Sequence, residues 1–158
     1  TDSLDVKTVK NIFLETIEHT EKYAQCSVAM KYYLFRAMEK TGLYGLTKKC
    51  WKIWENMLEE DLTTCVEDDI NKRSDCHAWG ALALYEIPEV ILGIRPGAPG
   101  YSKIEIHPQL GFLDSVSGKV ITGQGMLYMN CKKDKEGISY WVKNEKGKLI
   151  AGDKYEDD

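Results

Sequence analysis

Carboxylates and hydroxyls gather in one segment of the chain, DLTTCVEDDINKRSDCHAW, which separates two helical patterns. Glu67 is followed directly by Asp68 and Asp69, and Thr63 and Thr64 stand shortly before them. A carboxylate that is held in place and shielded on one side can act as a general base on water. Neighbouring carboxylates would raise its proton affinity if they were buried with it, and the two hydroxyls could orient it. From this pattern alone, a solvated acidic loop is the simpler interpretation.

A second group of polar and aromatic residues closes the same segment. His77 could donate a hydrogen bond to a sugar hydroxyl, and Trp79 could offer a ring face to the sugar. Alternatively, Ser74 or Asp75 caps a helix, and His77 lies in its first turn. A serine–histidine–aspartate triad is disfavoured because sequence neighbours on one turn rarely converge on one point. The spacing of His77, Asp75 and Glu67 matches no metal signature, so neither a metal nor a cofactor is expected.

The composition limits the classes of function. The 158 residues are 43% apolar and carry a net charge of −4, which suits one globular domain or two small ones. Lysines and arginines are scattered without forming a basic face, so no nucleic-acid partner is expected. No apolar run reaches the length that spans a bilayer, so no membrane partner is expected either. The first residues lack the pattern of a signal peptide, which says little if the chain is a piece of a longer protein.

The cysteines indicate no metal site and do not define a compartment. Their number is odd and their spacing contains no Cys-x-x-Cys pattern. The simplest interpretation is that they are small, mostly buried apolar residues. Cys65 and Cys76 flank the acidic run and could pair with each other, but this disulfide is the less favoured alternative.

Helical periodicity covers the first three fifths of the chain. Apolar residues recur at three-to-four spacing, with Asp2 or Ser3 as a candidate cap at the start. A break or kink is expected at Pro88, because proline removes a backbone donor and clashes with the preceding turn. The helices are expected at about residues 3–23, 27–40, 46–59 and 76–85, with a short further piece after the proline.

The period changes from helical to alternating after the run GIRPGAPG, which is typical of a firm turn or a domain boundary. Strands are expected at about residues 102–108, 118–122, 125–132, 138–143 and 148–152. Helices followed by strands favour an α+β fold over a parallel α/β fold. The expected domains are residues 1–94, made of helical hairpins, and residues 95–158, a small antiparallel β-sandwich-like domain.

Four runs in this order resemble the C-terminal end of bacterial α-L-rhamnosidases, which are six-hairpin glycoside hydrolases. They are TTCVE, RSDCHAW, VILGIRPGAPGYSKIEIHPQLG and the glycine-bounded GKVITGQGMLYM, and the resemblance covers about residues 27–129. It implies an (α/α)6 barrel of helical hairpins, present here only in part, beside the β domain. It also implies an inverting reaction, in which two carboxylic groups stand roughly 6.5–9.5 Å apart to leave space for water.

The resemblance assigns roles to three residues. Glu67 is implied to be the general base, His77 to contact the rhamnose ring, and Trp79 to support the wall of the site. The chain departs from the family at Val66, where an aromatic residue is common, and it lacks the upstream segments that carry the general acid. We therefore expect a C-terminal piece that is inactive alone and self-associates through exposed helix faces. Its parent would bind a rhamnose-containing glycan.

Two other interpretations stay open. The chain could be a non-catalytic structural or partner-binding module, or it could belong to a six-hairpin glycosidase that acts on another sugar. Loss of activity on Glu67→Gln in the parent would favour catalysis, whereas unchanged activity with lost assembly would favour a module.

Overall fold

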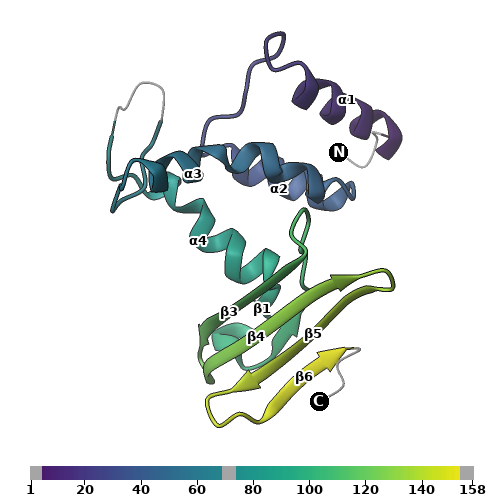
Figure 1. The fold of residues 1–158 in the computed structure, drawn as a ribbon, viewed down its shortest axis with the longest axis vertical. Coiled ribbons are helices and arrows are strands. Elements are labelled where there is room, and N and C mark those ends of the chain that lie inside the picture. The colour runs from purple at the N-terminus through teal and green to yellow at the C-terminus, as the bar shows by residue number, and fades with distance from the viewer. Residues whose placement is uncertain (1–4, 69–73, 154–158) are drawn as a thin grey trace. The chain divides into compact units, whose positions relative to one another are not determined.

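A computed structural model describes residues 5–68 and 74–153 (Figure 1). Helices come first and antiparallel strands follow, which confirms the α+β class. The chain divides into two compact units, residues 1–82 and 83–158, each of which is described by itself below. Asp2, Ser3 and Asp69, which were assigned roles above, lie outside the described residues. None of the described helices is long and apolar enough to cross a membrane.

The first helix, α1, spans Val6–Glu18 and is shorter at both ends than the sequence predicts. Asp5 caps it, because its carboxylate accepts the backbone N–H of Thr8 at 3.1 Å. His19 leaves the helical conformation and ends the helix. All residues of α1 are described and none is buried, so its apolar side is only partly covered.

The next helical pair is α2, Lys31–Lys40, and a longer segment made of the 3-10 helix η1, Tyr44–Trp51, and α3, Lys52–Glu59. The sequence predicts one continuous α-helix where η1 and α3 lie. Within η1, Thr47 is fully buried, and its hydroxyl donates to the Tyr44 carbonyl at 2.7 Å. Such a side-chain bond competes with the regular α-helical ladder, so the tighter helix extends to Trp51.

An aromatic cluster forms the core of the first unit. Trp51 and Trp54 have ring centroids 5.2 Å apart. Phe35 of α2 is fully buried and stacks on Trp51 at 5.8 Å. Tyr44 meets the same phenylalanine edge-on at 6.2 Å. These contacts join α2 to η1 and α3 and give the helical pair a rigid interior.

The segment around Pro88, where a break or kink is expected, contains a wide helical turn. The 3-10 helix η2, Ala78–Leu82, ends the first unit, and the second begins with the short helix α4, Ala83–Tyr85. A π-helix, η3, follows over Glu86–Ile91 and includes the proline. The wider π turn accommodates a residue that has no N–H and whose ring would clash in an α-helix.

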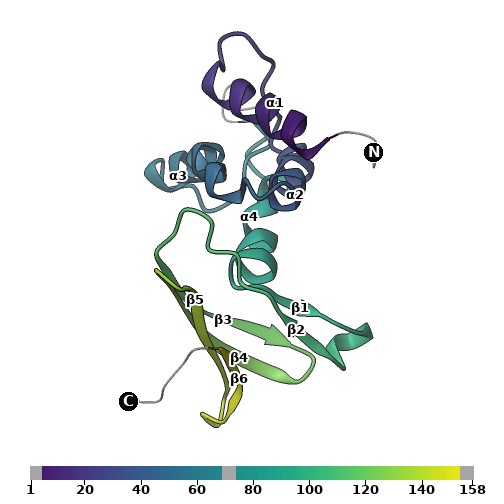
Figure 2. The same cartoon turned by 90° about the vertical axis from the view of Figure 1, so that its right-hand side faces the viewer.

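Strands β3 (Ser115–Thr122), β4 (Gly125–Asp134), β5 (Gly137–Asn144) and β6 (Leu149–Asp153) form an antiparallel sheet in that order (Figure 1). The corresponding predicted strands are confirmed. A two-stranded sheet pairs β1, Ile94–Pro96, with β2, Ile104–Ile106 (Figure 2). Strand β1 is not predicted from the sequence, because Pro96 indicates a turn locally and the strand's partner lies ten residues away.

One face of the four-stranded sheet is buried. Its apolar residues pack against the π-helix and β1, and the buried apolar residues of this unit are Val90, Ile91, Leu92, Ile94, Leu110, Val120, Leu127, Met129, Cys131 and Val142. Gly93 makes the turn between η3 and β1 with φ of 69°, and a Cβ there would lie 2.2 Å from the carbonyl oxygen of His107. Only glycine fits this turn without strain.

The domain limits predicted from sequence, residues 1–94 and 95–158, differ from the division at residues 82 and 83. Each compact unit is a group of residues that contact mainly one another. The predicted limits instead separate the residues expected in a helical barrel from those expected in the β domain. The predicted limits therefore stay a prediction, as does the (α/α)6 barrel.

Candidate functional site

Residues 61–79, called the acidic segment below, form a loop whose two limbs are joined by a short ladder of hydrogen bonds. The backbone N–H of Glu67 donates to the Ser74 carbonyl at 3.0 Å, and that of His77 donates to the Cys65 carbonyl at 2.8 Å. The Thr64 hydroxyl donates to the Asp75 carbonyl, so it secures the loop rather than orienting a carboxylate. The two groups of residues that the sequence singled out are therefore brought side by side.

Trp54 fastens the loop to helix α3. Its indole N–H, on a side chain only 8% exposed, donates to the Gly80 carbonyl at 2.7 Å. Gly80 is buried, and a Cβ there would lie 2.3 Å from the Val66 carbonyl oxygen and 2.8 Å from the Cys65 Cβ. The missing side chain therefore allows the two limbs of the loop to touch. Val66, where the resembling family often carries an aromatic residue, is 5% exposed and part of the core.

Glu67 and Trp79 line the same groove, which has a volume of about 520 Å³. Asp68 lines it as well, and the carboxylates are half-buried. Trp79 is 59% exposed, so one large aromatic surface is available in the groove. A carboxylate residue and an exposed indole residue therefore line one groove.

His77 lies next to this groove but does not line it. Its ring centroid is 4.8 Å from that of Trp79, with a 55° angle between the planes. The backbone N–H of Trp79 donates to His77 Nδ1 at 3.3 Å. This bond places the proton of a neutral ring on Nε2, which is then the nitrogen that can donate. The structure thus groups His77 with Trp79, and the direct sugar contact stays a prediction.

The capping role considered for Ser74 is not what the structure shows. Its hydroxyl contacts the Cys76 carbonyl at 3.4 Å, and the helix that follows begins only at Ala78. The His77 ring takes the backbone N–H of Trp79 instead, close to the start of η2. The imidazole therefore accepts a backbone N–H of the first helical turn, which a short polar side chain usually accepts at this position.

The rest of the groove lining is not predicted from the sequence. It comes from the chain before α2 and from α2, η1 and α3, and it includes Lys31, Lys49 and Lys52. Lys52 also binds Glu59 at 3.0 Å, which raises the lysine pKa. These lysines lie on three separate elements, so no local pattern in the sequence could assemble them. The groove consequently carries charges of both signs.

Within residues 5–68 and 74–153, no cluster of three or more histidine, cysteine or acidic side chains is arranged to hold a metal ion. Comparisons with protein-family models, curated proteins and solved structures found no match to this chain. The α-L-rhamnosidase resemblance therefore depends on the sequence motifs alone.

Proposed function

We propose that the chain is the C-terminal part of an inverting glycoside hydrolase that removes terminal α-L-rhamnose from glycans or glycosides. In this proposal its helices complete an (α/α)6 barrel in the parent protein. One observation carries the proposal on the structural side. Glu67, the implied general base, and Trp79, the implied wall residue, line a single groove about 520 Å³ in volume.

The groove suits the base half of an inverting mechanism. Glu67 is held through its own backbone by the hydrogen bond to Ser74 and stands beside an exposed aromatic ring. In this mechanism the carboxylate takes a proton from a water molecule as that water attacks the anomeric carbon. The general acid on the other side of the sugar comes from a different part of the parent protein. The described chain alone is expected to be inactive.

The test is hydrolysis of an aryl α-L-rhamnoside by the parent protein, with the wild type beside Glu67→Gln. The variant keeps the size of the side chain and removes the base, so kcat is expected to fall by about 10²–10⁴-fold. Asp68→Asn is the matched control, because this neighbouring carboxylate lines the same groove. Its kcat should stay within a few-fold of wild type.

Each remaining outcome selects another interpretation. Equal activity of Glu67→Gln and an active wild type would remove Glu67 from the mechanism. If the wild type cleaves a different aryl glycoside and Glu67→Gln does not, the enzyme class holds and the sugar is wrong. If no glycoside is cleaved and assembly of the parent depends on this segment, the non-catalytic module is favoured.

A further inference from the structure

Two cysteines from different elements line the groove that Glu67 and Trp79 share. Cys26 lies in the chain leading to α2 and is exposed, while Cys50 lies near the end of η1 and is half-buried. Twenty-three residues separate them in the sequence, including all of α2. The fold thus brings together two thiols that no sequence motif connects.

The two thiols also influence each other electrostatically. Burial is the main cause that raises the pKa of Cys50 above its ordinary value, and the charge of the Cys26 thiolate raises it further. Lys31, another residue of the groove, acts in the opposite direction on the same pKa. A charge at one sulfur therefore reaches the other, as expected for groups that face a common space.

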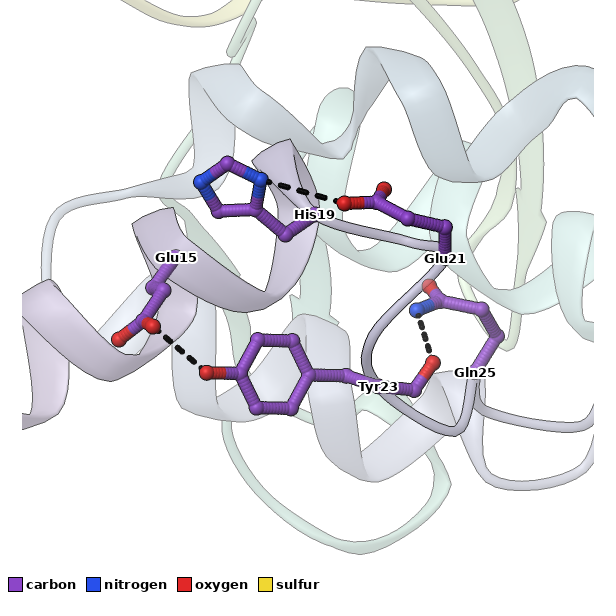
Figure 3. Close-up of polar contacts among 5 residues, drawn as sticks. All are labelled: Glu15, His19, Glu21, Tyr23 and Gln25. Carbon is purple, nitrogen blue, oxygen red and sulfur yellow. Dashed lines mark hydrogen bonds and ion pairs between the residues drawn. The ribbon is translucent and has the colours of Figure 1, made fainter.

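The chain before Cys26 is folded back by polar contacts that follow α1 (Figure 3). The Tyr23 hydroxyl donates to Glu15 Oε1 at 2.6 Å, and His19 Nδ1 lies 3.4 Å from Glu21 Oε1. The Gln25 side chain then donates to the Tyr23 carbonyl at 2.9 Å. These bonds hold the residues immediately before Cys26 in a defined turn.

Backbone hydrogen bonds hold the chain on the other side of this cysteine. The N–H groups of Met30 and Lys31 both donate to the Ser27 carbonyl at 3.1 Å. Cys26 is therefore presented to the groove from a segment that is secured before and after it.

We propose that Cys26 and Cys50 are a redox-active pair that closes to a disulfide when a peroxide enters the groove. The exposed Cys26 thiolate attacks one oxygen of hydrogen peroxide, the O–O bond breaks, and the leaving hydroxide takes a proton to become water. Cys26 is then a sulfenic acid. The Cys50 thiolate attacks its sulfur, the S–O bond breaks, a second water leaves, and the S–S bond forms. Two thiols and one peroxide thus become one disulfide and two waters.

The order of the steps follows from the burial of the two thiols. A thiolate is the attacking species, and Cys26 is the more accessible of the two. Cys50 attacks second, once its partner's sulfur is adjacent and electrophilic. The disulfide ties the chain before α2 to η1, so it fixes one wall of the groove. Because this inference depends on the groove and not on its ligand, it is independent of the proposed glycosidase activity.

The test is mass spectrometry of the whole chain after brief treatment with hydrogen peroxide and alkylation of the remaining thiols. In a sample taken before alkylation, we expect the oxidised chain to be about 2 Da lighter than the untreated chain, which corresponds to two hydrogen atoms. Peptide mapping should show residues 26 and 50 cross-linked, and a thiol reductant should restore the original mass. The oxidised chain should also melt at a higher temperature than the reduced one.

Matched variants separate this pair from Cys65 and Cys76, which flank the acidic run. Cys26→Ser and Cys50→Ser should each abolish the mass loss, whereas the double variant Cys65→Ser/Cys76→Ser should retain it. A 65–76 cross-link in the wild type in place of the 26–50 cross-link would overturn the proposal, as would oxygen addition at Cys26 with Cys50 still open to alkylation. Because the peptide map uses wild-type protein, the test stands even if a variant does not fold.

Discussion

At the level of single residues, the candidate site is defined by side chains that share a groove rather than a sequence motif. Glu67 and Trp79 come from opposite ends of the acidic segment, and both line the groove. Lys31, Lys49 and Lys52 face the same space from the helical pair. A ligand there would meet an aromatic surface with both acidic and basic groups around it. This combination suits a polar ligand with an apolar face.

The buried thiol of Cys131 supports a prediction about pH. Burial raises the pKa of Cys131 from an ordinary value of 9.0 to about 12, and the side chain is fully inaccessible. The folded chain therefore holds this proton more tightly than the unfolded chain does. Its contribution to stability is complete below pH 9 and is lost as the pH rises toward 12. The wild type should consequently lose stability more steeply than Cys131→Ala over that interval in thermal melts.

Thiol labelling provides an independent check of the same burial. A short pulse of iodoacetamide at pH 8 should modify Cys26 and Cys76, which are exposed, and leave Cys131 unmodified. Cys131 should react once the chain is unfolded in denaturant. Rapid labelling of Cys131 in the folded chain would contradict its place in the sheet core.

At the level of elements, the groove depends on how the acidic loop is fastened to α3. The loop limbs meet at Gly80, whose carbonyl accepts the Trp54 indole N–H. Regular helix and strand geometry contributes little to this loop. A packing contact and a few backbone bonds hold Glu67 in position, so small changes there should move the site.

Gly80→Ala tests this fastening. The added Cβ would lie 2.3 Å from the Val66 carbonyl oxygen, so the backbone has to shift. We expect a loss of about 1–3 kcal/mol in the free energy of unfolding, the usual range for overpacking a tight contact. Denaturant unfolding measures it, and Ala78→Ser, at an exposed position in the same helix η2, is the control. Equal stability of the two variants would mean that the loop does not need the close contact.

At the level of the whole molecule, apolar side chains remain exposed on the helices of the first unit. Ile12 of α1 is 53% exposed, Tyr33 of α2 is 64% exposed and Leu58 of α3 is 75% exposed. Exposed apolar surface of this kind favours association with another surface. We propose that a second copy of the chain covers part of it when the chain is studied alone.

Self-association is tested by light scattering over a range of protein concentrations. Ile12→Ser removes an exposed apolar side chain from α1 and should shift the monomer–dimer balance toward monomer. Asn11→Ser changes the adjacent exposed residue to the same side chain and should leave the balance unchanged. A wild-type chain that stays monomeric at every concentration would exclude the second copy as the partner.

Several features of this protein were determined by local sequence alone. The α+β class followed from a change of period, because helices and strands repeat their apolar residues at different spacings. Four sheet strands were identified because each alternates and ends at a glycine turn. Glu67, His77 and Trp79 were selected as residue types suited to sugar chemistry, and the α-L-rhamnosidase resemblance assigned their roles.

Tertiary structure decided what those residues face. The groove of Glu67 is also lined by residues of α2, η1 and α3. Cys26 and Cys50 line it too, although the whole of helix α2 separates them in the sequence. Strand β1 and the 3-10 helix η1 likewise depend on a partner strand and on the buried Thr47. Such contacts join residues far apart in sequence, and their energy depends on burial and distance. Local periodicity indicates which face of an element is apolar but not which distant residues that face meets, so only the folded chain could reveal these contacts.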